Sequence, residues 1–329
     1  MGAVLRVTRT GARAIVALDA SGRARTMRVR EDGRIVDARA FELGGGLDEA
    51  VDAMRGPFWS CAAVAGGAGT ETERARALVG TSGRFLVECE IGDFGARRRV
   101  LEDGRTAPAL GPHTGYVRDV VVSRDGGDAW SCACNFAPRW RLGREGAFEP
   151  SGEVLTLFTG DILRLALCEW EETVTVFCGV ADGTVRAFRR RRGDLRAEDL
   201  GVVGGDASTH RTRGRVSALC VVDDEWLVSG SHDGCVMTHD ARSPSAPALA
   251  RNEPLDGKVH DLLALADGRV LAAGEHGIAA YESATGRDGR LIMLDAAFRG
   301  VREPVRSLAS VDSRIVVGTA SGDVFTIEA

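Results

Sequence analysis

Short apolar runs, broken by turns of Asp, Gly and Asn, repeat along the whole chain. The segment VSGSHDGCVMTHD (228–240) shows the pattern most clearly: a small-residue strand, an Asp-Gly turn, a second strand and a closing Asp. Tight Asp-Gly turns are typical of β-hairpins, because Gly tolerates positive φ and Asp bonds its own backbone. Related segments occur at 29–38, 78–87, 178–188, 272–281 and 317–327. The pattern predicts an all-β chain.

The turns are regularly spaced, at intervals of 43 to 52 residues. They fall at Gly33, Gly83, Asn135, Gly183, Gly234, Gly277 and Gly322. Such a period is typical of β-propeller blades, which bury their faces only against neighbouring blades. We therefore expect seven blades in one domain over residues 1–329, with Asn135 accepting positive φ in the third unit.

Each unit predicts a series of strands. The mostly apolar inner strands are expected at 58–64, 115–123, 161–168, 214–222, 258–265 and 304–310. Weaker outer strands are expected at 97–101, 153–157, 200–204, 247–251 and 290–294. Helical periodicity is confined to 68–78, which predicts a short turn of helix in a loop.

The two ends of the chain suggest how the last blade is completed. The last unit stops after its third strand, and residues 2–10 precede a full set of strands. We expect these residues to form the outer strand of the last blade, which gives an even first spacing. The alternative places residues 3–9 as an inner strand, with Gly22 as the following turn.

Composition narrows the setting. The chain has 44% hydrophobic and 27% charged residues, a net charge of −5 and a single lysine, Lys258. It has no apolar stretch long enough to span a membrane and no secretory signal, so we expect an intracellular protein, cytoplasmic or nuclear. Its eight Cys are scattered and form no CxxC pair, which predicts buried free thiols and no metal site. Alternation would put Cys132 and Cys134 on one strand face.

The segments SGSHDGCVMTHD (229–240) and GPHTGYVRDVVVSRDG (111–126) resemble WD40 repeats, and the resemblance extends over the whole chain. It implies a seven-bladed β-propeller in which His113 and His210 are structural histidines. The Trp that such repeats place before the closing Asp is kept at Trp140 and replaced by Phe188 and His239, so the usual His–Ser–Asp–Trp network is partial. Kelch repeats share the period but need paired glycines before aromatic markers, which are missing here.

Catalytic motifs are missing from the sequence: GxSxG, HExxH and P-loop patterns do not occur. Ser231, His232 and Asp233 are contiguous, but neighbours along a strand and turn point different ways, so they indicate a structural role. The basic run FRRRRG (188–193) on an acidic chain without interleaved aromatics argues against a dedicated nucleic-acid binder. The same run faintly resembles the basic motif of phosphoinositide-binding propellers, but on the third strand it is misplaced for that role.

One further pattern concerns the inner strands. By the resemblance, the residue after the first apolar position of each inner strand faces one mouth of the central channel. These residues are Trp59, Arg118, Arg164, Ser217, His260 and Arg306. Three arginines and a histidine would attract anions, and Arg forks suit carboxylates and phosphates. The competing interpretation is that Asp119 and Asp261, one residue further on, neutralise these cations.

We expect a non-catalytic scaffold that binds other proteins and grips an acidic or phosphorylated segment at this basic mouth. Trp59 and Tyr116 are the expected aromatic anchors of the interface. No cofactor is expected. The alternative is a propeller hydrolase of the lactonase or diphthine methylesterase type, with its site at the channel; it would need a base or metal ligands there.

Overall fold

The computed structural model describes residues 3–10, 13–20, 23–41, 58–64, 75–92, 95–101, 103, 105–156, 158–205, 210, 214–252, 255–283, 291–295 and 298–329. These residues form strands and turns, with one short 3₁₀ helix, η3 (Phe298–Gly300). No helix in these ranges is both long and apolar enough to cross a membrane.

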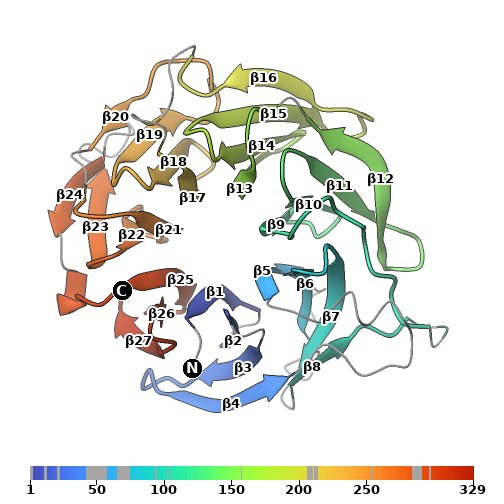
Figure 1. Cartoon of the computed structure of the whole chain (residues 1–329), viewed down its shortest axis with the longest axis horizontal. Helices are drawn as coiled ribbons and strands as arrows, with labels where there is room; N and C mark the ends of the chain where they lie inside the picture. Colours follow the sequence, from blue (N-terminus) through green and yellow to red (C-terminus); the bar gives the residue numbers. More distant parts are fainter. Residues whose placement is uncertain are drawn as a thin grey trace. The chain divides into compact units, whose positions relative to one another are not determined.

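The strands pair into seven small sheets, each made of strands that follow one another in the chain (Figure 1). Six of the sheets have four strands, and the last has three in the described part of the chain. Short antiparallel hairpins account for this topology, because a tight turn can join only antiparallel neighbours. The predicted all-β class and the seven units are confirmed.

The chain divides into two compact units, of which the first comprises residues 1–154 and 309–329. The expected single domain stays a prediction. The strands of the first unit are β1 (Val4–Arg9), β2 (Ala14–Asp19), β3 (Ala24–Val29), β4 (Ile35–Phe41), β5 (Phe58–Val64), β6 (Ala75–Thr81), β7 (Leu86–Gly92), β8 (Gly95–Arg98), β9 (Asp119–Val122), β10 (Asp128–Cys132), β11 (Ala137–Leu142), β12 (Phe148–Leu155), β26 (Arg314–Thr319) and β27 (Val324–Glu328).

The second unit comprises residues 155–308. Its strands are β13 (Ile162–Trp170), β14 (Thr173–Val180), β15 (Val185–Arg191), β16 (Glu198–Val202), β17 (Val216–Val222), β18 (Trp226–Ser231), β19 (Val236–Asp240), β20 (Ala250–Arg251), β21 (Val259–Ala264), β22 (Val270–Gly274), β23 (Gly277–Ser283) and β24 (Leu291–Asp295), followed by the start of β25 (Val305–Val311). The predicted inner strands correspond to β5, β9, β13, β17, β21 and β25. The outer strands β8, β12 and β16 begin earlier than expected.

The position predicted for the N-terminal strand is wrong. β1 pairs with β2 and is the first strand of the first sheet, as in the alternative that we had weighed. Its apolar residues Val4 and Val7 are buried against Val311 and Val316 of the last sheet. β1 therefore meets the last sheet through side-chain packing on its face.

In four sheets a glycine on the second strand lets the neighbouring sheet approach closely. If this glycine had a Cβ atom, the atom would lie 2.6 to 2.8 Å from the Cγ1 atom of a valine in the adjoining sheet. The valine lies on the first strand of that sheet or just before it. The glycine–valine pairs are Gly318 with Val4, Gly80 with Val117, Gly179 with Val216, and Gly230 with Val259. This packing explains the Gly at this position of these four sheets, because any larger residue would push the sheets apart.

Three turn predictions need correction. Gly33 has φ of 83° but lies between the third and fourth strands of its sheet, so it is not equivalent to Gly83 or Gly234. In the third sheet Cys134, not Asn135, has positive φ. An Asp-Gly pair marks a tight hairpin wherever it lies in a sheet. The sequence therefore did not distinguish a turn between the second and third strands from one between the third and fourth. In the predicted helical turn, residues 75–78 belong to β6, and 68–74 lie outside the described residues.

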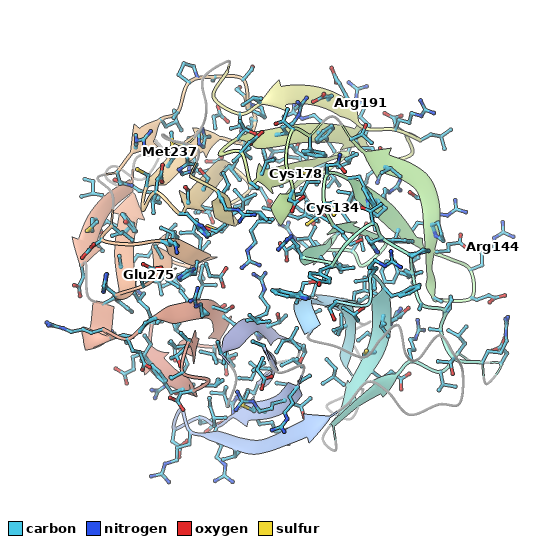
Figure 2. The ribbon with its side chains drawn as sticks, in the orientation of Figure 1. Cys134, Arg144, Cys178, Arg191, Met237 and Glu275 are labelled. Atoms are coloured by element: carbon cyan, nitrogen blue, oxygen red, sulfur yellow. The ribbon has the colours of Figure 1, made fainter. Side chains whose placement is uncertain are left out.

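All eight cysteines are free thiols, as predicted, and six are buried. Cys178 lies within β14, where burial raises the pKa of its thiol (Figure 2). Cys134 lies beyond the end of β10 in a left-handed turn, so it does not share a strand face with Cys132. Buried thiols of this kind act as small hydrophobic side chains.

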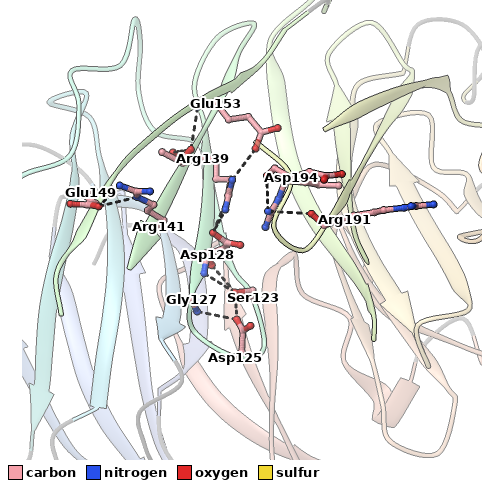
Figure 3. Close-up of polar contacts among 12 residues, drawn as sticks. Ser123, Asp125, Gly127, Asp128, Arg139, Arg141, Glu149, Glu153, Arg191 and Asp194 are labelled. Atoms are coloured by element: carbon pink, nitrogen blue, oxygen red, sulfur yellow. Dashed lines mark hydrogen bonds and ion pairs between the residues drawn. The ribbon is translucent and has the colours of Figure 1, made fainter. Parts of the chain in front are cut away.

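Buried ion pairs tie strands together within the first unit. Arg139 on β11 contacts Asp128 of β10 at 2.7 Å and Glu153 of β12 at 3.4 Å (Figure 3). Glu88 on β7 is 2% exposed and pairs with both Arg76 and Arg99. Buried carboxylates need such partners, because an unpaired buried charge is strongly destabilising. These networks position the sheets but lie on strands other than those that carry the candidate site.

Candidate functional site

The candidate site residues lie at the beginnings of the first strands of the sheets, where a shared irregularity aligns them. β1, β5, β13, β17 and β21 each have one residue inserted into the pairing with the second strand. The inserted residues are Leu5, Trp59, Leu163, Ser217 and His260. Bulges of this kind redirect a side chain at the end of a strand.

The bulges correct one predicted equivalence. The residue of β13 that matches Trp59, Ser217 and His260 is Leu163, and Arg164 lies one position further on. The sequence offered ILRL without marking the inserted residue, so the charged side chain was taken as the equivalent one. Leu5 and Arg6 of β1 were missed altogether, because β1 had been assigned to a sheet edge.

Arg164, His260 and Arg306 come together in the second unit, and we call these three residues the basic cluster. Arg164 donates from Nε to the Ser217 carbonyl at 2.7 Å and from Nη2 to the His260 carbonyl at 3.4 Å. Arg306 Nη1 lies 3.0 Å from Nε2 and 3.2 Å from Nδ1 of His260. The two guanidinium groups therefore contact the same residue, Arg164 at the backbone carbonyl and Arg306 at the ring of His260.

His260 is only 8% exposed. Burial, then the positive charge of Arg306 and the nearby His232, lowers the pKa of His260 to about 4. The ring is therefore neutral at neutral pH and can accept a hydrogen bond from the Arg306 guanidinium. Two cations and a neutral imidazole form a site that favours negative charge.

Further groups surround the basic cluster. The His232 ring lies edge-on to the His260 ring, 6.3 Å between centroids. Burial, followed by the charges of Lys258 and Arg215, lowers the pKa of His232 as well. Glu275, labelled in Figure 2, lies on the turn after β22. Its carboxylate pairs with Lys258 at 3.4 Å. The cations that lower the pKa values of the two histidines thus outnumber the carboxylates that raise them.

The expected neutralisation by aspartates takes a different form. Asp261 is buried and accepts hydrogen bonds from Ser307 Oγ at 2.8 Å and from the Leu308 amide at 3.0 Å. Asp119, also buried, lies 3.9 Å from Arg6. The carboxylate of Asp261 thus joins β21 to β25, and that of Asp119 lies beside β1.

The aromatic anchors lie in the first unit. Trp59 and Tyr116 stack with ring centroids 5.7 Å apart and planes 8° from parallel. Tyr116 is 51% exposed, among the most exposed large hydrophobic residues of the described part of the chain. Arg118 follows closely in the chain, and its amide donates to the Cys132 carbonyl at 2.9 Å. The structure brings Trp59 and Tyr116 together as a pair.

Two other sequence features have structural explanations. Asp233 of the Ser231–His232–Asp233 segment lies 3.3 Å from His210 Nδ1, whereas His232 turns toward His260. In the run 188–193, Phe188 and Arg190 are buried, and Arg189 stacks on Trp170 at 5.3 Å. The described residues contain no group of three or more His, Cys, Asp or Glu able to hold a metal ion.

No protein-family model matches the chain, and no curated protein matches its sequence. Solved structures do match its fold. The WD40 β-propeller domain of Doa1 is 16% identical with a TM-score of 0.68, covering 99% of this chain and 92% of that domain. The computationally designed protein Ika8 is also 16% identical, with a TM-score of 0.62 and coverage of 100% and 96%.

The chain has the fold of a seven-bladed WD40 β-propeller. Its seven sheets are the blades, and the first strands with their bulges are the inner strands. At this level of identity the comparison establishes the fold alone, because one fold can carry many functions. What the propeller binds has to be argued from its own side chains.

Proposed function

We propose that this propeller is a non-catalytic scaffold that binds other proteins, and that the basic cluster grips an acidic or phosphorylated segment of a partner. The observation that carries the proposal is the pair of guanidinium groups held beside a neutral, buried His260. Arginine is suited to this task because its planar fork donates two parallel hydrogen bonds to a carboxylate or phosphate.

The positions of the two arginines support the proposal. Arg164 is oriented by the carbonyls of Ser217 and His260, so less side-chain entropy is lost when a ligand binds. Arg306 contacts the His260 ring, so its positive charge also lies beside His260. A ligand anion would also offset the repulsion between these two cations.

The aromatic pair supplies a second contact surface for a partner protein. Stacked Trp and Tyr side chains offer a large, rigid area at small entropic cost, and such residues are frequent at interface hot spots. The half-exposed ring of Tyr116 fits this role, with Trp59 stacked behind it. Arg118 follows Tyr116 closely in the chain, and we include it as a contact because of this position.

The test measures peptide binding by calorimetry. The probes are the acetylated, amidated peptides Gly-Glu-phosphoserine-Glu-Gly, its unphosphorylated form and Gly-Gln-Ser-Gln-Gly. We expect the first to bind best, and the double variant Arg164→Glu, Arg306→Glu to weaken its binding by about a hundredfold, given the worth of charge-assisted hydrogen bonds. Arg144→Glu, the same change at an exposed site in the first unit, is the control. Equal binding by the double variant, with an unchanged melting temperature, would exclude the basic cluster.

A further inference from the structure

The segment Ser231–His232–Asp233 is divided between two environments of the second unit. The Asp233 amide donates to Ser231 Oγ at 3.1 Å, and the Asp233 carboxylate lies 3.3 Å from His210 Nδ1, so the two outer residues belong to a buried network. The ring of His232 turns toward His260 and lies edge-on to its ring, with 6.3 Å between centroids. The middle residue of the segment therefore lies beside the basic cluster.

The two histidines are held on neighbouring sheets. His232 follows β18, where its amide donates to the Arg215 carbonyl at 3.0 Å, and His260 is the inserted residue of β21. His260 is buried, whereas His232 is partly exposed to solvent. The ring of His232 forms no hydrogen bond with the residues that the structure describes. Its nitrogens are therefore available to a proton and to a ligand of the basic cluster.

Cations from several strands and turns face the two rings. Arg306 of β25 lies with Nη1 3.0 Å from Nε2 of His260. Burial, followed by the charges of Lys258 and Arg215, which precede β21 and β17, lowers the pKa of His232. A proton on either ring is therefore opposed by like charge as well as by burial.

The nearby carboxylates already have partners. Asp261 accepts hydrogen bonds from Ser307 Oγ and from an amide of β25. Burial opposes ionisation of Glu275, but the hydrogen bond from Lys258 and its charge prevail and lower the pKa of this carboxyl below its usual value of 4.5. Glu275 therefore keeps its negative charge between neutral pH and pH 5.5, the range in which an imidazole titrates.

An anion on the basic cluster changes the protonation of the rings. Arg164 and Arg306 both contact His260, so an anion that they bind lies beside its ring and close to His232. An opposite charge nearby favours the protonated form of a histidine and raises its pKa. At mildly acidic pH the complex therefore holds a proton that the free protein does not, and the added positive charge faces the ligand.

We propose that His232 is a further residue of the anion site, and that His232 and His260 take up a proton when the basic cluster binds its ligand. Because this role rests on the proposed function, it concerns the same acidic or phosphorylated segment. Proton uptake makes the ligand bind more tightly as pH decreases, since lower pH supplies the proton that the complex holds. Binding by the basic cluster thus strengthens between neutral pH and mild acid.

The test measures binding of a probe whose own charge is constant. The probe is an acetylated, amidated peptide of three cysteic acid residues between two glycines, because its sulfonates stay ionised from pH 5.5 to pH 7.5. Calorimetry at constant ionic strength, in two buffers of different ionisation enthalpy at each pH, gives both the affinity and the proton uptake. We expect the affinity to be about tenfold higher at pH 5.5 than at pH 7.5, which corresponds to an average uptake of about half a proton per complex.

Asparagine variants test whether the two histidines hold the proton. His232→Asn combined with His260→Asn should abolish the proton uptake and the dependence of affinity on pH, because an amide does not titrate. His232→Asn alone changes a partly exposed position, so it keeps the test valid if the buried change prevents folding, and it should remove part of the uptake. His276→Asn, at an exposed histidine that faces Asp256, is the matched control and should keep the wild-type uptake.

The outcomes separate this role from the proposed function. Equal affinity at both pH values, without proton uptake, would overturn the role of the histidines and leave the proposed function intact. Unchanged uptake in His232→Asn would remove His232 from the site, and unchanged uptake in the double variant would overturn the proposal as a whole. Failure of the peptide to bind at any pH would overturn the proposed function itself, and the proton uptake with it.

Discussion

Two sheets of this propeller place different residues in one buried network. In the sheet β9–β12, Ser131 Oγ lies 2.8 Å from His113 Nε2 and accepts a hydrogen bond of 2.8 Å from Trp140 Nε1. In the sheet β17–β20, Ser229 Oγ lies 3.0 Å from His210 Nε2. Here the position of Trp140 is taken by His239, which is 1% exposed, and neither of its ring nitrogens has a hydrogen-bond partner.

The networks also end differently. His113 Nδ1 lies 3.0 Å from the Arg84 carbonyl, a neutral partner. His210 Nδ1 lies 3.3 Å from the carboxylate of Asp233. Burial opposes ionisation of Asp233, but hydrogen bonds from His210 and the Cys235 amide prevail and lower its pKa to about 2. One geometry therefore supports a neutral network in the first unit and a charged one in the second.

The largest effect is expected from making the first network resemble the second. Trp140→His removes a 5%-exposed indole and its hydrogen bond to Ser131, and leaves a cavity. We expect a loss of about 3 kcal/mol in the free energy of unfolding, measured by urea titration, because large-to-small changes in a core cost this much. A loss below about 1 kcal/mol would mean that the indole adds little to this sheet.

Acid should separate the two networks nearly as strongly. Burial, followed by the proximity of His210, lowers the pKa of His239 from 6.5 to about 4. Between these pH values the unfolded chain binds a proton that the folded chain does not bind, so stability falls as pH decreases through this window. We expect His239 alone to lower the free energy of unfolding by about 3 kcal/mol across this window.

The measurement compares urea unfolding at pH 7 and pH 4 for the wild type and for His239→Phe. The variant should lose less stability, because it has no proton to exclude. His276→Phe, at an exposed histidine, is the control and should follow the wild type. Parallel pH profiles for the wild type and His239→Phe would refute a role of His239 in acid sensitivity.

The serines should differ by a smaller amount. Ser131→Ala leaves both His113 and Trp140 without their shared partner, so we expect a loss of about 2 kcal/mol. Ser229→Ala affects His210 and should cost about 1 kcal/mol. Equal losses in thermal or urea unfolding would show that the indole hydrogen bond adds nothing.

The smallest effect is a gain. His239→Trp restores the indole at the position of Trp140 and lets Nε1 donate to Ser229, so we expect an increase of about 1 kcal/mol. In this background Ser229→Ala should cost as much as Ser131→Ala does in the wild type. A destabilised variant would indicate that the left-handed Gly204, which faces the His239 ring, leaves no room for the indole.

The predictability of the fold varied along the chain. Residues 216–240 form three strands at the expected places, because apolar runs and an Asp-Gly turn agree there. In the first sheet the same signals misled: the Asp-Gly turn at Gly33 joins the third and fourth strands, and β1 lies at the start of its sheet. Local turn chemistry is the same in both hairpins, so it does not reveal which two strands of the sheet a turn joins.

The candidate site was predicted in part. His260 and Arg306 contact each other, as their equivalent positions suggested, and Trp59 stacks on Tyr116. Arg164 joins them from the neighbouring position, because a bulge at Leu163 shifts its strand by one residue. Bulges arise from pairing between strands and leave little trace in one strand's sequence.

By itself the sequence determined the all-β class, the seven units and most turn positions, since these depend on local periodicity and backbone preference. Only the tertiary structure decided that β1 begins the first sheet and that His239 is buried without hydrogen-bond partners. These features depend on contacts between segments far apart in the chain, such as Val4 against Gly318. Burial and pairing over such separations are properties of the packed sheets, and no local pattern encodes them.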